Sequence, residues 1–590
     1  MSKRTLVDLT KKPYNLEKEA IDWVENTIAN MSLEEKIGQL FVNMGSSRDE
    51  AYLTEMVQKY HIGGVRYNPA SASEVYDQNY ILQTKSKIPL LIAANTESGG
   101  NGACRDGTEV GAQVKLAATQ NKKYAYEMGR VGGYEASAIG CNWSFAPVVD
   151  INYNWRNPII STRAYSENPD MVLEFALEYM KGAMENGILP GAKHFPGDGV
   201  DERDQHLSYS VNSFSCEEWD KTFGKVYKGL IDAGLPSLMA GHIHMPAYSK
   251  KFNPALRDED LLPATLSKEL ITDLLRGQLG FNGLVVTDAS HMIPMTASMK
   301  RSDALPTSIA AGCDLFLFFN DPDEDFGYMM EGYKKGVITN ERLHDALRRI
   351  LGLKAKLGLH KKAKNAIMLP KEEAMKRIGL PENKAIFRKV ADNAITLVKD
   401  KQNIWPITPT KYKRVLLVDV SGIKGGFGAL IGSKENPVQT MKALLEAQGF
   451  AVSIWESAEE KIMKLPENER LAAIMNVYAQ KRPITDLTDN YDLIINIANS
   501  NSGAVVQRLV WPASKGTPDI PFYIYEVPTI FVSVQCPFHL ADVPQVRTYI
   551  NCYDAKKDTL ECLVEKMMGK SQFKGVSPVD AYCGLIDTKI

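Results

Sequence analysis

The sequence has few cysteines and no long apolar run. Its 8 cysteines are scattered through 590 residues, and no two have the Cys-x-x-Cys spacing of a zinc or redox motif. A chain of this length does not depend on disulfides for its stability. The absence of 18 consecutive apolar residues argues against a transmembrane helix, and the opening MSKRTLVDLTKKPYN lacks the apolar segment of a signal peptide. We therefore expect a cytoplasmic protein with reduced thiols and no membrane partner.

An excess of charge of either sign is also missing. Lys and Arg number 69 and Asp and Glu number 71, which gives a net charge of −2. Proteins that bind nucleic acid concentrate positive charge, so no nucleic-acid partner is expected. Hydrophobic residues make up 44% and charged residues 24% of the chain, which are the proportions of a globular protein and exclude disorder as its main state.

Short apolar runs alternate with amphipathic stretches through the first 370 residues. This alternation predicts parallel strands joined by helices. Eight such strands suit a closed (β/α)8 barrel, and a doubly wound open sheet is the alternative. The predicted strands are residues 37–44, 63–67, 89–94, 143–149, 189–194, 237–242, 283–287 and 314–318. A capping box, Ser32 with Glu35, predicts one helix start.

A second α/β domain is predicted after the barrel. We expect the barrel over residues 1–370, a connecting segment over 371–412, and an αβα sandwich over 413–590 with strands at 414–420, 451–455, 493–498, 529–534 and 548–552. The glycine-rich segment 421–428, SGIKGGFG, does not follow the G-x-G-x-x-G spacing of dinucleotide loops, so it is interpreted as a turn before a helix.

Working residues of such barrels stand at the carboxyl ends of the strands. Lys193 and His194 end one strand, and the loop after it carries Asp204 and His206. An Asp two residues before a His can hydrogen-bond the imidazole and favour its protonated form. A solvated acidic loop is the alternative interpretation.

Two further strand ends carry chemistry-bearing residues. Asp288 directly follows an apolar strand, where it is either a site carboxylate or a helix N-cap. His242 and His244 lie two apart and share a strand face, as metal ligands of barrel hydrolases do. The same spacing also occurs in structural histidines.

Several motifs together resemble family 3 glycoside hydrolases, specifically their β-N-acetylhexosaminidase branch. They span nearly the whole chain and are MSLEEKIGQLF, FAPVVDINYNWRNPIISTRAYSENP, KHFPGDG followed by DQH, LMAGHIHMP, LLRGQLGFNGLVVTDASHM, RRILGLKAKLGL and NAITLVKDKQNIWPI.

The resemblance implies a retaining exo-β-N-acetylglucosaminidase that acts on small amino-sugar glycosides without a cofactor or metal. Asp288 would be the nucleophile, and His206, held by Asp204, the general acid and base. His242 and His244 then revert to structural or pocket-lining roles. The residues implied or proposed to bind substrate are Lys193, His194, Arg163, Asn95, Asp150 and Arg66.

Two positions depart from the branch pattern. Asn95 stands where the family usually has an acidic residue, which alters recognition of the non-reducing end of the sugar. Asp198 stands where the branch has a second His, which is expected to add negative charge to a mobile loop.

Other functions remain open on the sequence alone. A β-glucosidase of the same family is disfavoured by the Asp-x-His loop. Phosphorolysis is a corollary of the histidine, because a neutral imidazole repels phosphate less than a carboxylate does. A metal-dependent amidohydrolase built on His242 and His244 and a non-enzymatic carbohydrate-binding protein belong to different classes.

Overall fold

The computed structural model describes residues 6–420, 436–479, 483–500, 508–509 and 517–590. The chain forms two compact units. The first comprises Met1–Val110, Lys122–Asn157 and Ala164–Lys384, and the second comprises Gly111–Asn121, Pro158–Arg163 and Ala385–Ile590. The predicted turn over residues 421–428 lies outside the described residues.

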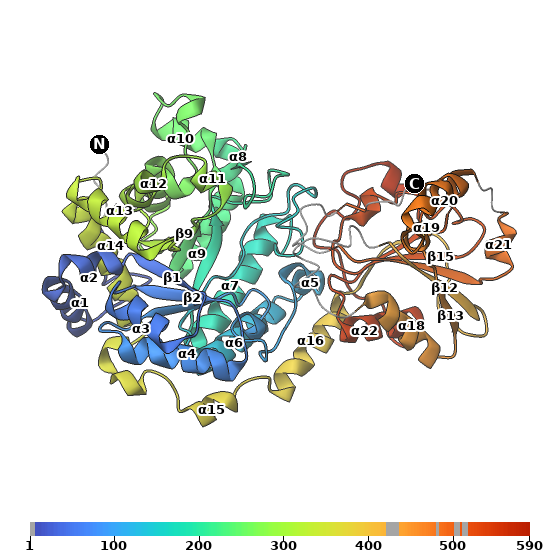
Figure 1. The fold of residues 1–590 in the computed structure, drawn as a ribbon, viewed down its shortest axis with the longest axis horizontal. Helices are drawn as coiled ribbons and strands as arrows, with labels where there is room; N and C mark the ends of the chain where they lie inside the picture. The colour runs from blue at the N-terminus through green and yellow to red at the C-terminus, as the bar shows by residue number, and fades with distance from the viewer. Residues whose placement is uncertain (1–5, 421–435, 480–482, 501–507, 510–516) are drawn as a thin grey trace. The chain divides into compact units, whose positions relative to one another are not determined.

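The first unit is a closed barrel of eight parallel strands surrounded by helices (Figure 1). Around the barrel the strands run β1-β10-β9-β7-β5-β4-β3-β2. This confirms the predicted (β/α)8 barrel and rules out the open sheet. The strands are β1 Phe41–Gly45, β2 Gly64–Tyr67, β3 Leu91–Ala94, β4 Trp143–Ser144, β5 Leu189–Phe195, β7 Ser237–Ala240, β9 Leu284–Ala289 and β10 Leu315–Leu317, with a separate pair, β6 Ser210–Val211 and β8 Ile243–His244.

Helices follow most of these strands. They are α1 Lys18–Asn30, α2 Leu33–Gly38, α3 Glu50–Gln58, α4 Ala72–Lys85, α6 Lys123–Ala138, α7 Pro169–Glu185, α8 Cys216–Lys221, α9 Phe223–Ala233, α10 Pro246–Phe252, the π-helix η4 Glu269–Gln278, α11 Ile293–Thr296, α12 Arg301–Ala311, α13 Pro322–Lys334, α14 Asn340–Lys356, α15 Lys371–Met375 and α16 Pro381–Ala394.

The start of α2 follows the sequence prediction in one respect and departs from it in another. Ser32 accepts from the backbone N–H of Glu35 and donates its own N–H to the Glu35 carboxylate, so the capping box is confirmed. The predicted strand 37–44 begins too early. Ile37 and Gly38 belong to α2, and β1 starts only at Phe41.

The barrel is closed at the amino ends of its strands by a buried ion network. Asp314, just before β10, accepts from Arg276 at 2.7 Å and also pairs with Arg342. All three side chains are at most 8% exposed. Buried pairs of this kind belong to the stability of the fold, while the opposite end of such barrels carries the function.

The second unit is a six-stranded sheet with the order β11-β16-β15-β14-β12-β13. All five predicted strands are present as β12 Arg414–Asp419, β13 Ala451–Ile454, β14 Leu493–Ala498, β15 Thr529–Ser533 and β16 Thr548–Asn551. The sixth, β11 Thr396–Asp400, lies inside the segment expected to be a connection and pairs antiparallel with β16. The helices of this unit are α5 Gln113–Ala118, α18 Pro437–Ala447, α19 Ala458–Met463, α20 Glu467–Ala479, α21 Thr485–Thr488 and α22 Lys557–Met567.

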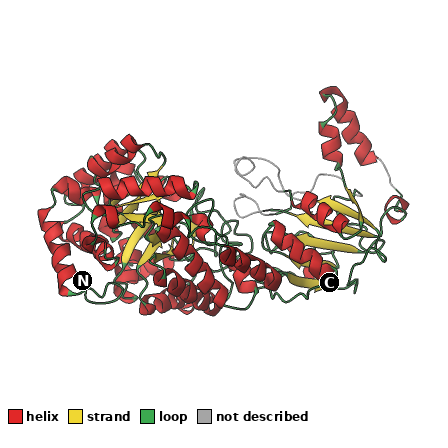
Figure 2. Ribbon diagram, turned by 90° about the horizontal axis from the view of Figure 1, so that it is seen from below, coloured by secondary structure: helices red, strands yellow, loops and turns green. Residues whose placement is uncertain are grey.

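Alternate residues of each central strand pack into two separate cores, as a sheet covered on both faces requires. Leu417 and Ile495 face a core shared with α18 and α22, and Leu416 and Ile494 face the other core. Figures 1 and 2 show helices lying against the strands of this sheet.

Two short segments from within the barrel sequence pack in the second unit. In residues 111–121, Lys115 is fully buried, pairs with Asp554 and donates to Thr559 at 2.7 Å. Val114 and Ala118 share a small core with Ala394 and Tyr553. These segments are therefore built into the second unit.

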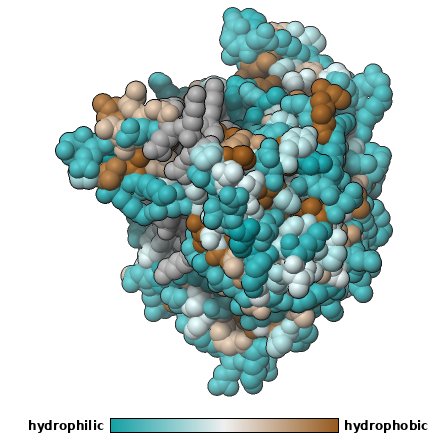
Figure 3. All heavy atoms as spheres, turned by 90° about the vertical axis from the view of Figure 1, so that its right-hand side faces the viewer, coloured by the Kyte–Doolittle hydropathy of each residue, from teal (hydrophilic) through white to brown (hydrophobic). Residues whose placement is uncertain are grey.

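The surface carries no membrane-spanning signal in the part of the chain that the structure describes, because none of its helices is both long and apolar enough to cross a bilayer. Figure 3 shows apolar atoms in separate patches on a mostly hydrophilic face.

Candidate active site

Asp288 stands at the carboxyl end of β9. Its side chain is 9% exposed, and one carboxylate oxygen accepts from the backbone N–H of Ala289 at 2.7 Å. The next helix, α11, has Met292 at its N-cap. The N-cap interpretation of Asp288 is therefore wrong.

The charge of Asp288 is maintained by histidines. Burial raises the pKa of this carboxyl group, but the surrounding histidines, His194 first, together with the backbone N–H of Ala289 outweigh burial and hold the pKa below its usual value. The carboxylate is consequently ionised at neutral pH, which a carboxylate nucleophile requires.

His206 lies on the loop after β5 and is held by Asp204. The imidazole Nδ1 is 2.7 Å from Asp204 Oδ1, and the same oxygen accepts the backbone N–H of His206 at 2.8 Å. A carboxylate can only accept, so Nδ1 carries a hydrogen and Nε2 is the nitrogen that exchanges a proton elsewhere. The hydrogen bond expected between Asp204 and His206 is thus present, on a loop where the His206 side chain is 45% exposed.

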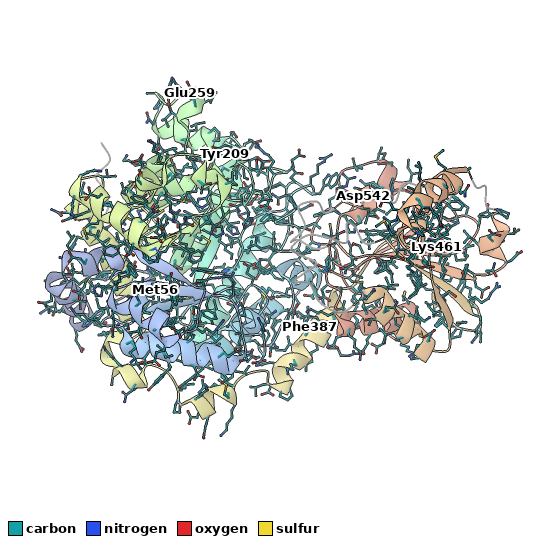
Figure 4. All side chains as sticks on the ribbon, viewed as in Figure 1. Met56, Tyr209, Glu259, Phe387, Lys461 and Asp542 are labelled. Atoms are coloured by element: carbon teal, nitrogen blue, oxygen red, sulfur yellow. The ribbon has the colours of Figure 1, made fainter. Side chains whose placement is uncertain are left out.

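The loop that carries His206 is fixed to neighbouring loops. The His206 carbonyl accepts from the N–H of Ile293 at 3.2 Å. Tyr209, labelled in Figure 4, donates to the Ala297 carbonyl at 3.0 Å. Both contacts join the loop to the segment that follows Asp288, so the two catalytic candidates belong to adjoining loops.

His194, on β5, is held by two hydrogen bonds to Asp150. Asp150 is not exposed (0%); one of its oxygens lies 2.7 Å from His194 Nδ1 and the other accepts the His194 N–H at 3.1 Å. The second oxygen also accepts the N–H of Asp198 at 2.8 Å. Asp150 thus orients the ring that contributes first among the histidines to the low pKa of Asp288.

Asp198 is held by neighbouring amide groups. It is 1% exposed, and its carboxylate accepts from Asn157 at 2.9 Å, from Gln205 at 2.7 Å and from the N–H of Gly199 at 2.6 Å. The carboxylate that Asp198 adds is therefore not exposed on the loop surface, because amide donors enclose it and join parts of the loop to one another.

Lys193, Arg66 and Asn95 end three strands on the same side of the barrel. Lys193 is nearly buried and pairs with Glu97 at 2.5 Å. Arg66 donates to Asn68 at 2.7 Å, and burial lowers the pKa of its guanidinium, partly offset by Glu97. Asn95 is half-buried, and its amide oxygen has no hydrogen-bond partner among the described residues.

The two ring nitrogens of His242 are occupied by protein groups, whereas the buried Nδ1 of His244 has no hydrogen-bond partner among the described residues. His242 is fully buried, with Nδ1 2.8 Å from the Thr265 hydroxyl and Nε2 3.0 Å from the Ala289 carbonyl. Burial lowers its pKa, so a neutral ring donating from Nε2 to the carbonyl fits both contacts. Within the described ranges no group of three or more His, Cys, Asp or Glu side chains could hold a metal ion. These contacts favour a structural role for His242.

Arg163 is half-buried and lies in the segment 158–163 of the second unit, so it is described apart from the barrel residues. Sequence reasoning gave no role to three partners that the fold supplies: Glu97 for Lys193, Gln205 for Asp198, and Thr265 for His242. Glu97 and Thr265 come from other parts of the barrel sequence, and Gln205 lies seven residues from Asp198 on the same loop, so none of the three follows from a local motif.

Comparisons with known proteins show which family and which solved structures this chain resembles. The chain matches the family described as "Glycosyl hydrolase family 3 N terminal domain" over residues 32–353. A Cellulomonas fimi protein named beta-N-acetylglucosaminidase/beta-glucosidase is 43% identical over 589 residues, 99% of this chain and 100% of that protein. A solved structure named beta-glucoside phosphorylase BglX bound to 2FGlc is 40% identical with a TM-score of 0.88, and the match covers 98% of this chain and 99% of that one. A family 3 beta-N-acetylglucosaminidase from Paenibacillus sp. str. FPU-7 is similar in fold, with 23% identity, a TM-score of 0.75, and coverage of 94% and 100%.

Proposed function

Because this chain belongs to glycosyl hydrolase family 3, and is thus a glycoside hydrolase, we propose that it is a retaining exo-β-N-acetylglucosaminidase acting on small glycosides. The observation that carries this mechanism is the combination of a buried, ionised Asp288 with a histidine, His206, held through Nδ1 by Asp204.

In the first step Asp288 attacks the anomeric carbon, and a bond forms between its carboxylate oxygen and that carbon. The bond to the leaving-group oxygen breaks, and the leaving oxygen takes the proton from Nε2 of the His206 imidazolium. The products are a glycosyl ester on Asp288, a free alcohol and a neutral imidazole.

In the second step a water molecule attacks the anomeric carbon from the other side. Neutral His206 takes the proton of this water, and the bond to Asp288 breaks. Asp204 stabilises the imidazolium that forms, just as it favours the proton donor in the first step. The configuration of the sugar is retained because it is inverted twice.

Among the barrel residues, sugar binding is assigned to Lys193, His194, Arg66 and Asn95, and the role of Arg163 in the second unit stays a prediction. Asp150 was predicted to join them, but its oxygens are already used by His194 and Asp198, and it is not exposed. We assign it the role of positioning His194.

The donor sugar is tested with nitrophenyl β-glycosides of GlcNAc, glucose, GalNAc and xylose. The proposal expects the highest kcat/KM for GlcNAc, and a 2-fluoro glycoside should label Asp288. Asp288→Ala should lose at least ~10³-fold activity. Preference for glucose would replace the aminosugar assignment, and labelling of another residue in a fully active Asp288→Ala variant would disprove the nucleophile.

Phosphorolysis is the second candidate function. It is favoured by the 40% identical structure that is named a beta-glucoside phosphorylase and by the neutral charge of His206 after the first step, which leaves less repulsion toward an incoming anion. With phosphate in place of water, no proton has to be removed from the nucleophile. Measuring glycosyl phosphate against free sugar at tens of millimolar phosphate distinguishes the two outcomes.

A further inference from the structure

A cavity opens at the end of the barrel away from Asp288. It has a volume of about 400 Å³, within the roughly 300–1,000 Å³ of small-molecule sites. Its wall includes Pro89, two residues before β3 begins. The cavity therefore lies at the amino ends of the strands, whereas the candidate active site lies at their carboxyl ends.

Three chain segments build this cavity. They are α1, the turn between α4 and β3, and the segment that follows α14 and runs beside α4 (Figure 1). All three belong to the first unit.

The charged side chains that line the cavity are all lysines among the described residues. Lys87, Lys362 and Lys364 line the cavity, and no acidic side chain does so among the described residues. Lys87 pairs with Glu35 at 2.5 Å. Lys362 and Lys364 have no ion pair in the part of the chain that the structure describes, so their charge is available to an anion.

The remaining wall suits a sugar ring. Trp23 lines the cavity with an aromatic side chain, and the centroid of its ring lies 5.2 Å from the centroid of the His360 ring. Asn26 and Asn30 stand one helical turn apart on α1 and add amide groups. Aromatic faces with amide and cationic groups around them match the apolar face and polar rim of a charged monosaccharide.

His360 supplies an independent indication. Both of its ring nitrogens are buried, and neither has a hydrogen-bond partner among the described residues. Buried polar groups are usually hydrogen-bonded, and a hydroxyl group bound in the adjoining cavity would give these nitrogens a partner.

We propose that this cavity is a second carbohydrate site, which binds a monosaccharide carrying a phosphate or carboxylate group. Trp23 packs against the ring, Lys362 and Lys364 bind the anionic group, and a rotation of His360 toward the cavity gives its nitrogens a hydroxyl partner. The site does not depend on the proposed catalytic function.

The test is isothermal titration of the full chain with glucose 6-phosphate, glucuronate, glucose and inorganic phosphate. We expect glucose 6-phosphate, glucuronate or both to bind more tightly than glucose or phosphate alone, and these two arms distinguish the anionic group. The double variant Lys362→Glu/Lys364→Glu should weaken that binding at least about tenfold, and Trp23→Leu should weaken it as well.

Lys361→Glu is the matched control, since Lys361 pairs with Glu19 and does not line the cavity. Its binding should match that of the unmodified chain, and hydrolysis of a nitrophenyl glycoside without added sugar phosphate should be the same in all the lysine variants. Three results would each overturn the proposal: no heat of binding with either charged sugar, equal binding of glucose or phosphate alone, or binding that is unchanged in the double variant. Unchanged binding in the double variant would place the ligand elsewhere, such as beside Asp288.

Discussion

At the scale of single residues, proton transfer in this protein depends on the hydrogen-bond partner and the exposure of each imidazole. His206 uses Nδ1 for Asp204, and His194 uses Nδ1 for Asp150. The surroundings of the two rings differ, because His206 is 45% exposed and His194 only 4%. An exposed ring can exchange protons with substrate and water, whereas a buried ring held by a buried carboxylate keeps a fixed orientation.

Replacing His206 by Ala should affect substrates unequally. Nitrophenol leaves as a stabilised anion and needs no proton, whereas a sugar leaving group does. We expect disaccharide hydrolysis to fall by roughly 10²–10⁴-fold, and the pre-steady-state release of nitrophenol to fall much less. Stopped-flow and steady-state rates measure both. His344→Ala, at a half-exposed position of α14, is the control; equal slowing of both substrate classes by His206→Ala would remove the acid/base role.

Asp150→Asn should change the pH profile as well as the rate. Removing this carboxylate frees the His194 ring, and because this ring lowers the pKa of Asp288, that pKa should rise toward its usual value. Asp288 must be ionised to attack, so the acidic limb of kcat/KM should move to higher pH. Asp232→Asn, on the exposed surface of α9, is the matched control. A loss of stability with an unmoved acidic limb would indicate a merely structural Asp150.

At the scale of elements, α14 carries a lysine into the core. Lys354 is not exposed (0%), donates to the Gln39 amide oxygen at 2.6 Å, and burial lowers its pKa to about 7. In the unfolded chain the pKa of this lysine is about 10.4. Between these values the unfolded state binds more protons, so stability rises with pH from about 7 to about 10.

Lys354→Met should therefore stabilise the protein most at or below neutral pH. The gain in free energy of unfolding should be about 3–5 kcal/mol at pH 6 and should shrink toward pH 10, as followed by denaturant unfolding at several pH values. Lys18→Met, whose side chain is 91% exposed, should change little at any pH. A gain that is independent of pH would show that Lys354 is not held neutral by burial.

Elements with a strong local pattern could be predicted from the sequence, and those set by distant partners could not. The barrel strands are near-continuous apolar runs because both of their faces are buried, and this pattern is visible locally. β11, residues Thr396–Asp400, was missed because it is an edge strand of mixed burial that pairs only with β16. At the site, Asp204 and His206 lie two positions apart in the sequence, so their pairing could be predicted. The hydrogen bond from Asn157 to Asp198 joins residues 41 positions apart and requires the folded chain.

At the scale of the whole molecule, the two units are not two consecutive lengths of chain. The inserts 111–121 and 158–163 leave the barrel sequence to pack in the second unit. Val114, Ala118 and Ile160 are fully buried there.

A chain cut after residue 384 should consequently fail to give a soluble, cooperatively folding barrel. Its inserts would expose apolar side chains and leave Lys115 without Asp554 and Thr559. The soluble fraction and the thermal transition by circular dichroism test this, with co-expressed residues 385–590 as the rescue. A monomeric 1–384 fragment with a sharp transition would contradict the expectation.

The inserts also constrain how such a protein can diversify. A single crossover between two relatives anywhere from residue 164 to 384 would combine the inserts of one parent with the sheet of the other. Lys115 would then meet whatever the second parent carries at position 554, in a buried place where an unmatched charge is costly. Natural or laboratory shuffling of the second unit thus has to exchange three pieces of chain together, and positions 115 and 554 should change as a pair between lineages.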